Sequence, residues 1–128
     1  MMTARVLVVD DDPDIVEYLS IFLEDNGYEV RTAGNEKSAL LTIEDFDPNA
    51  VLIDVIMPGL SGLDLMVKLR QNPKWRDLPM IVITGNDKIL IDAGRSYIQS
   101  YEGIRGPDEI LGKPVDRDKL LTLLKMLC

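Results

Sequence analysis

The stretch VLVVDDDPDIV, residues 6–16, decides the fold. Four apolar, β-favouring residues run directly into three aspartates, and Pro13 then opens a segment with helical spacing. Carboxylates this close raise one another's energy, so the folded chain must bring positive charge to them. We expect both a helix N-terminus and a cation at this point, since each would supply it.

Strand-like apolar runs and helical patterns alternate five times along the chain. Strands are expected at Val6–Val9, Tyr28–Ala33, Ala50–Ile53, Met80–Thr84 and Glu109–Leu111. The runs VLVV, AVLI and MIVI are entirely apolar, which is typical of strands buried on both faces. The alternation predicts an α/β fold, in which a doubly wound, five-stranded parallel sheet lies between two layers of helices. No linker is evident, so we expect a single domain over residues 1–128.

Each predicted helix has its apolar residues on one face. These residues are Ile15, Leu19, Phe22 and Leu23; Ala39, Leu40 and Ile43; Leu65, Met66 and Leu69; Leu90, Ala93, Gly94 and Tyr97; and Leu120, Leu121, Leu124 and Leu127. Asn35 and Asp116 precede the second and fifth helices and are predicted to cap them. Trp75 is predicted to lie in the loop between the third helix and the fourth strand, with no function assigned to it.

The composition excludes several classes of function. The net charge is −8, from 22 acidic and 14 basic residues, which argues against direct binding of nucleic acid. There is no histidine, so Ser-His-Asp catalysis, Cys-His catalysis and histidine zinc sites are absent. The single cysteine, Cys128, rules out an intrachain disulfide and suits a cytoplasmic protein. No apolar run approaches the ~20 residues of a membrane span, so no membrane partner is expected.

Polar residues follow four of the five predicted strands. In open parallel sheets, ligands bind at the carboxyl ends of the strands, near the point where the strand order reverses. The residues at these ends are Asp10, Asp11 and Asp12 for the first strand, Asp54 for the third, Thr84 for the fourth and Lys113 for the fifth. Carboxylate oxygens are the ligands that Mg²⁺ prefers, and Mg²⁺ keeps open positions for water or phosphate oxygens. The sequence therefore predicts a magnesium site with room for a phosphoryl group.

Two other interpretations do not account for the whole acidic run. Helix capping accounts for Asp12 and Asp14, but not for Asp10 and Asp11. An EF-hand calcium loop fails, because its sixth position holds an isoleucine in place of glycine and its twelfth holds Ile21 in place of glutamate.

Asp54 can also act as a nucleophile, because a carboxylate can attack phosphorus to form an acyl phosphate. The transfer depends mainly on positioning and neutralisation of charge, which the metal and Lys113 would supply, while the Thr84 hydroxyl would bond an oxygen of the attached group. Taken alone, Thr84 reads as an ordinary strand residue and Lys113 as a surface lysine. The segment GPDEILGK is not a Walker phosphate loop, because five residues separate its glycines and Pro114 follows its lysine.

Four motifs, VLVVDDDPDI, VLIDVIMPGLSGLDL, IVITG and LGKP, resemble in order and spacing the receiver domain of bacterial two-component response regulators. The resemblance covers nearly the whole chain and implies a flavodoxin-like (βα)5 fold. It implies these roles: Asp54 as phosphoacceptor; Asp10, Asp11, Asp54 and the main-chain carbonyl of Ile56 as Mg²⁺ ligands; Thr84 as the switch hydroxyl; and Lys113 as the phosphate-contacting lysine.

The resemblance also implies partners. Receiver domains take a phosphoryl group from a phosphohistidine on a sensor histidine kinase or phosphotransfer protein, and the absence of histidine here fits the recipient. Phosphorylation then repacks the face formed by the fourth helix, fifth strand and fifth helix, which commonly serves dimerisation or output. A homodimer through this face is therefore a possible assembly.

The chain departs from the family pattern in three places. Ile110 stands where an aromatic residue usually precedes the lysine by three positions. Thr84 and Lys113 lie further apart than usual, so extra residues fall between Gly85 and Arg105. The positions that often tune the loss of phosphate in the family match Ile56 and Asn86. The apolar side chain of Ile56 cannot hydrogen-bond an attacking water, which predicts slow self-hydrolysis, and Asn86 would partly offset this effect.

Two alternatives from other classes of function stay open. A hydrolase with an aspartyl-phosphate intermediate, of the haloacid dehalogenase type, also places an aspartate after its first strand. Its DxDx(T/V) pattern breaks here, because Pro13 and Asp14 follow the aspartates. A pseudo-receiver that binds partners without phosphate is disfavoured by the complete acid, threonine and lysine set.

Overall fold

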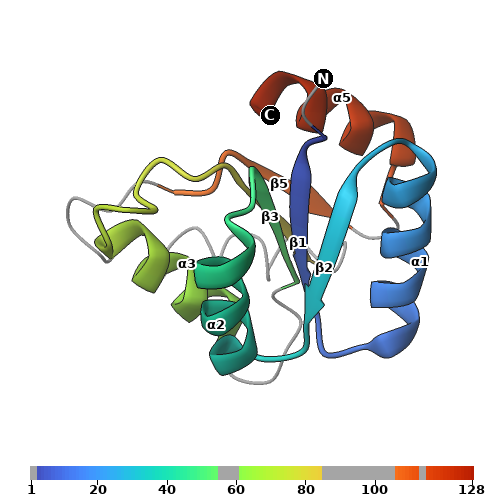
Figure 1. Cartoon of the computed structure of the whole chain (residues 1–128). Helices are drawn as coiled ribbons and strands as arrows, with labels where there is room; N and C mark the ends of the chain where they lie inside the picture. Colours follow the sequence, from blue (N-terminus) through green and yellow to red (C-terminus); the bar gives the residue numbers. More distant parts are fainter. Residues whose placement is uncertain (1–2, 55–60, 85–105, 113–114) are drawn as a thin grey trace.

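A computed structural model describes residues 3–54, 61–84, 106–112 and 115–128. The elements are β1 (Arg5–Val9), α1 (Pro13–Asp25), β2 (Glu29–Ala33), α2 (Glu36–Phe46), β3 (Ala50–Asp54), α3 (Ser61–Gln71), β4 (Met80–Thr84), β5 (Glu109–Gly112) and α5 (Arg117–Leu127). The strands form one parallel sheet in the order β2-β1-β3-β4-β5 (Figure 1). This is the order of the flavodoxin-like fold.

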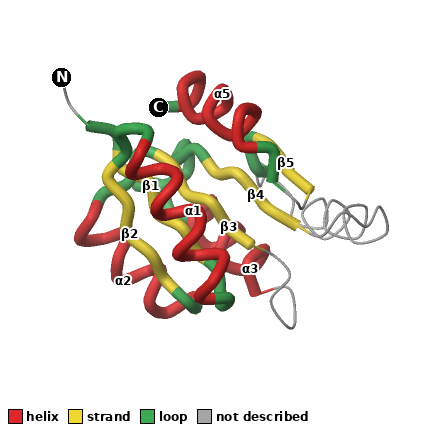
Figure 2. Tube along the Cα trace, turned by 90° about the vertical axis from the view of Figure 1, so that its right-hand side faces the viewer, coloured by secondary structure: helices red, strands yellow, loops and turns green. Residues whose placement is uncertain are grey.

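Helices cover both faces of the sheet. Helices α2 and α3 lie on one face, and α1 and α5 lie on the other (Figures 1 and 2). The predicted doubly wound, three-layer α/β/α fold is therefore confirmed. The expected helix around Leu90–Tyr97 lies outside the described residues.

The alternation of side chains along each strand builds a separate core on each face of the sheet. In β1, Leu7 and Val9 pack toward α2 and α3, while Val6 and Val8 pack toward α1 and α5. All four are essentially inaccessible to solvent. Strands buried on both faces need apolar residues at every position, which explains why VLVV contains no polar residue.

The helix ends follow the predicted capping pattern. The Asn35 side chain accepts a hydrogen bond from the N–H of Ser38 at 2.8 Å, and that of Asp116 accepts one from the N–H of Lys119 at 3.1 Å. These contacts satisfy N–H groups that have no partner within the first turn of a helix. Trp75 lies in the connection between α3 and β4 as predicted, but its indole is buried in the core beside α3.

The strand order reverses at β1, because the chain passes from β1 to β2 on one side and returns to β3 on the other. The carboxyl ends of β1 and β3 thus border the crevice where open α/β sheets bind ligands. Among the described residues, no helix is long and apolar enough to cross a membrane.

Candidate functional site

Two buried carboxylates lie at the carboxyl ends of neighbouring strands. Val9, the last residue of β1, pairs in register with Ile53; Asp10 directly follows Val9, and Asp54 directly follows Ile53. Their relative exposures are only 3% and 5%. Adjacent parallel strands run about 4.8 Å apart, so the register places two acidic residues side by side in a buried setting. Asp54 is itself the last residue of β3, one residue further than the strand that the sequence predicted.

Asp10 is tied to the backbone on both sides. Its N–H donates to the Ala33 carbonyl at 3.0 Å, which extends the contact between β1 and β2. Its Oδ1 accepts from the N–H of Asp12 at 2.9 Å, so the turn into α1 orients this carboxylate. This role of Asp10 is not visible in the sequence, because it depends on how the backbone folds back after β1. Asp11, the next residue, is exposed.

The remaining acids of the run begin helix α1, as predicted. Asp12 is the N-cap, and its Oδ1 accepts from the N–H of Asp14 at 2.9 Å. Pro13 occupies the first helical position, where its missing N–H costs nothing. Asp14 lies in the first turn, where the helix dipole favours negative charge.

Strand β4 brings Thr84 to the same edge of the sheet. Asp54 pairs with Ile83, and Thr84 is the next residue and is 2% exposed. Thr84 pairs in turn with Gly112, the last residue of β5. The predicted site residues Asp10, Asp11, Asp54 and Thr84 therefore gather at the carboxyl edge of β1, β3 and β4.

The other predicted site residues are not placed. Ile56 and Lys113 lie outside the described residues, and so does Asn86. Lys113 directly follows Gly112 in the chain. Ile110, which stands where an aromatic residue was expected from the resemblance, is partly buried and packs against the core on the side of α2 and α3.

The carboxylates present fit the preferences of Mg²⁺. This cation usually takes one or two carboxylates and completes its octahedral shell with water or phosphate oxygens. Asp10 and Asp54 supply two hard oxygen donors from neighbouring strand ends, and Asp11 is adjacent. Within the described part of the chain, no group of three or more His, Cys, Asp or Glu side chains has the arrangement of a metal site. Two carboxylates are the number that a partly hydrated Mg²⁺ ion commonly takes from a protein.

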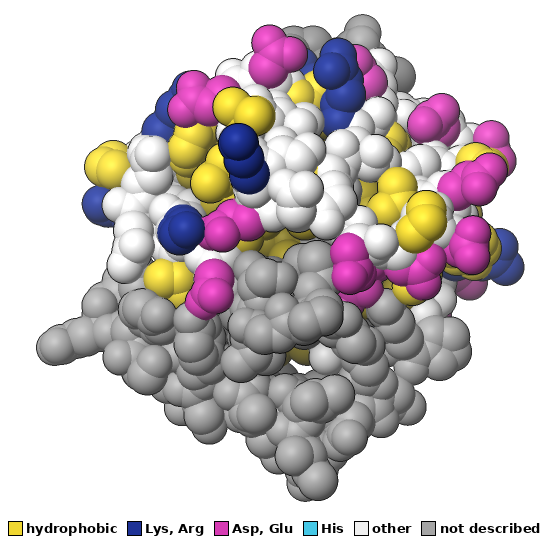
Figure 3. Space-filling model, turned by 90° about the horizontal axis from the view of Figure 1, so that it is seen from below, with side chains coloured by type: hydrophobic (Ala, Val, Ile, Leu, Met, Phe, Trp, Pro, Cys, Tyr) yellow, Lys and Arg dark blue, Asp and Glu magenta, His cyan; other side chains and the backbone are white. Residues whose placement is uncertain are grey.

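The described surface at this edge is acidic where α1 begins. Figure 3 views the molecule from the carboxyl ends of the strands and shows groups of neighbouring Asp and Glu side chains on its described part. Asp11, Asp12 and Asp14 are exposed here, at the beginning of α1. Negative charge at this edge attracts cations and repels an unaccompanied phosphate.

Comparison with known proteins identifies the family. The family model described as the response regulator receiver domain matches residues 6–125. An uncharacterized 14.6 kDa protein from Leptolyngbya boryana is 36% identical over 96% of this chain and 88% of its own length. The response regulator MprA of Mycolicibacterium vanbaalenii is 37% identical over 98% of this chain. The chain spans only 51% of MprA.

Solved structures agree with this result. The chemotaxis protein CheY4 of Vibrio cholerae superposes with a TM-score of 0.82 and 26% identity, covering 99% of this chain and 100% of CheY4. Sequence and structure match the same kind of domain over nearly all of the chain. The chain belongs to the response regulator receiver domain family of two-component systems.

Proposed function

We propose that this chain, as a single receiver domain over residues 1–128, accepts a phosphoryl group on Asp54. The observation that supports this most strongly is the burial of Asp54 beside Asp10 at adjacent strand ends, with Thr84 on the next strand. Burying two acidic side chains side by side is unfavourable unless a cation or other positive group is brought to them.

The chemistry follows from the nature of the groups. A carboxylate oxygen of Asp54 attacks the phosphorus of a phosphohistidine; the new O–P bond forms as the P–N bond breaks, and the imidazole nitrogen leaves with the bonding electrons. The product is an aspartyl phosphate. The rigid end of β3 holds the attacking carboxylate, which lowers the entropic cost of the transfer.

Mg²⁺ would be held by Asp10, Asp11, Asp54 and the main-chain carbonyl of Ile56. When bound, it neutralises charge on the phosphoryl oxygens. Lys113 adds a second positive charge from the residue after Gly112, and Thr84 offers a hydroxyl to a phosphoryl oxygen. Asp10 is prepared for its role because the Asp12 N–H fixes its carboxylate.

The phosphodonor is a sensor histidine kinase or a phosphotransfer protein, in the cytoplasm. Phosphorylation biases the fourth-helix, β5 and α5 face toward a second arrangement, which a homodimer, an output domain or a separate partner reads. Several relatives are longer than this chain, which covers 51% of MprA and 26% of PleD. The chain itself has no direct role in binding nucleic acid, in keeping with its charge of −8.

Labelling with acetyl phosphate tests the proposal. The unaltered protein should gain one phosphoryl group when Mg²⁺ is present and none after chelation, as read by intact mass. Asp54→Asn should abolish the gain. Asp45→Asn is a matched control, since Asp45 is exposed near the end of α2, which leads into the first residue of β3, whereas Asp54 is the last residue of that strand; it should label at the normal rate. Labelling that persists in Asp54→Asn would overturn the assignment, and turnover of a generic phosphate ester would favour a hydrolase.

A further inference from the structure

The burial pattern of β5 specifies its register only weakly. It has four residues and pairs with β4 at the end of the described sheet. Only Leu111 among its residues is buried, whereas every residue of β4 is buried. Register is strongly specified where a strand has one face clearly buried and is prone to slip where that pattern is weak. Another interaction is needed to hold β5 in place.

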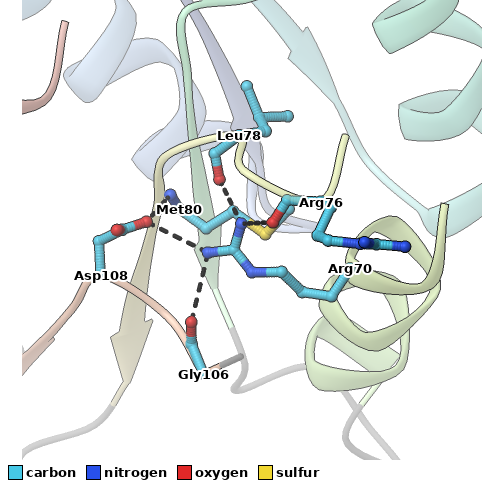
Figure 4. Close-up of polar contacts among 6 residues, drawn as sticks. All are labelled: Arg70, Arg76, Leu78, Met80, Gly106 and Asp108. Atoms are coloured by element: carbon cyan, nitrogen blue, oxygen red, sulfur yellow. Dashed lines mark hydrogen bonds and ion pairs between the residues drawn. The ribbon is translucent and has the colours of Figure 1, made fainter. Parts of the chain in front are cut away.

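Arg70, near the end of α3, is buried and binds the connection between α3 and β4. Its side chain has no exposed area. Its Nη1 donates to the carbonyls of Arg76, at 2.9 Å, and Leu78, at 2.6 Å (Figure 4). These carbonyls belong to the connection that leads into β4. Arginine is almost never fully buried without such partners, so the position of the guanidinium is closely specified.

The same guanidinium also holds the segment that enters β5. Its Nη2 donates to Asp108 Oδ2 at 3.2 Å and to the Gly106 carbonyl at 3.3 Å (Figure 4). Asp108 Oδ2 accepts from the N–H of Met80 at 2.8 Å, and the Asp108 N–H donates to the Met80 carbonyl at 2.8 Å. Asp108 is therefore joined to Met80 by both its side chain and its backbone, and to α3 through Arg70.

These contacts fix the register of β5 at its first residues. Met80 and Asp108 immediately precede the first pair, Ile81 with Glu109, and the ladder then runs without interruption to Thr84 with Gly112. A slip of one residue would move Gly112 by about 3.3 Å along the strand and reverse the direction of its neighbours' side chains. Because Lys113 is the next residue in the chain, a shift of Gly112 would also displace the point from which Lys113 starts.

We propose that the Arg70–Asp108 pair is a positioning element for phosphoryl transfer, which acts from the amino ends of β4 and β5 by setting the register that places Gly112 beside Thr84. This inference rests on the proposed role of Lys113, the residue after Gly112. Arg70 and Asp108 touch no reacting group and act only through β5. The extra residues between Gly85 and Arg105 make such an anchor useful, since a longer connection restrains the start of β5 less.

Acetyl phosphate labelling of Asp108→Ala provides the test. The initial rate at saturating phosphodonor, corrected for the folded fraction, should fall roughly tenfold or more, because misplacement by an ångström is enough for such a loss. Hydrogen exchange should show reduced protection at the amides of β5, with β1 and β3 unchanged. Asp108→Asn, which keeps an oxygen for the Met80 N–H, should restore most of the rate. Ile43→Ala is the control: Ile43 is buried on α2, which packs mainly against β1, β2 and α3, so its loss destabilises the fold without removing a contact at the beginning of β5.

A double-mutant cycle separates positioning from general destabilisation. In a Lys113→Ala background, Asp108→Ala should slow labelling by less than about twofold, because the residue through which it acts is already gone. Mg²⁺ affinity, measured by calorimetry, should stay the same in Asp108→Ala, since the metal ligands lie on other strands. If Asp108→Ala folds too poorly, Arg70→Met in a stabilising osmolyte replaces it, with the same expected losses.

The outcomes distinguish this inference from the proposed function. Failure of the unaltered protein to label at Asp54 would refute the proposed function. Normal labelling of the unaltered protein, with Asp108→Ala as fast as Ile43→Ala or equally slow in the presence and absence of Lys113, would refute the positioning role alone.

Discussion

Thr84, the last residue of β4, pairs in register with Gly112, the last residue of β5. Thr84, whose hydroxyl is proposed to contact the phosphoryl group, therefore lies beside Gly112 on the neighbouring strand. Gly112 is the residue that precedes Lys113. Asp54 lies on the other side of β4, one register position earlier, opposite Ile83. The three strand ends together define the geometry on which the proposed chemistry depends.

Thr84→Val should permit transfer of the phosphoryl group to Asp54 but destabilise the phosphorylated state. Valine keeps the branched shape of a strand residue that is 2% exposed, but removes the hydroxyl. We expect Asp54 to be labelled still, while the affinity for beryllofluoride with Mg²⁺ falls several-fold, by about 1 kcal/mol for one lost hydrogen bond. Titration followed by NMR measures this. Unchanged affinity would show that the hydroxyl does not contact the phosphoryl site.

Asp10→Asn should remove the stabilisation that Mg²⁺ gives to the folded state. A ligand that binds only the folded protein stabilises it by about 1.4 kcal/mol at ten times its dissociation constant. Thermal unfolding with and without Mg²⁺ should show this gain in the unaltered protein and little of it in the variant. Asp12→Asn is the matched control, because asparagine caps α1 equally well and Asp12 is not a proposed ligand. An equal loss in both variants would contradict the assignment of Asp10.

The contact between Lys68 on α3 and Glu36 on α2 should make stability depend on pH in the alkaline range. Their charged atoms lie 2.7 Å apart, and the hydrogen bond from Lys68 to Glu36, with their opposite charges, raises the pKa of Lys68 above its ordinary value. The stabilisation is fully present below that ordinary pKa and is lost as the pH rises through the raised pKa. Urea unfolding should therefore show Lys68→Met to be less stable than the unaltered protein at neutral pH. The difference should vanish at strongly alkaline pH, and a constant difference would refute this explanation.

The aspartyl phosphate should be long-lived. Ile56, which matches a position that often tunes the loss of phosphate in the family, cannot hydrogen-bond an attacking water. After removal of the phosphodonor, intact mass should show slow decay of the phosphorylated form. Ile56→Asn, which restores a polar side chain, should speed the decay. A half-life of only seconds in the unaltered protein would contradict the prediction.

The parts of the site set by strand ends could be predicted from the sequence. Asp10, Asp54 and Thr84 each follow a fully apolar run, and parallel strands bring their carboxyl ends to one edge, so local pattern and topology together suffice. Helix caps such as Asn35 are equally local, since cap and partner are three residues apart. The fold class could also be predicted from local patterns, because it depends on the alternation of strand-like and helix-like hydrophobic periodicities.

The Arg70–Asp108 pair could not be predicted in the same way. Arg70 and Lys68 are the basic residues in the last turn of α3, and basic residues at such positions are usually exposed. Its burial depends on carbonyls of the following connection and on a carboxylate 38 residues away. Trp75 was missed as a core residue for a similar reason: a single aromatic in a loop has no periodicity that reveals which face it covers.

A crystal structure of the protein with Mg²⁺ and beryllofluoride tests the central claim most directly, because this group mimics a phosphoryl group bonded to a carboxylate. The account predicts beryllium bonded to an Asp54 oxygen, Mg²⁺ contacting Asp10 and Asp54, and both Thr84 Oγ1 and Lys113 Nζ within hydrogen-bonding distance of fluorine. Beryllofluoride bound to any other carboxylate, or an Asp54 side chain directed away from Asp10 with the metal elsewhere, would contradict it.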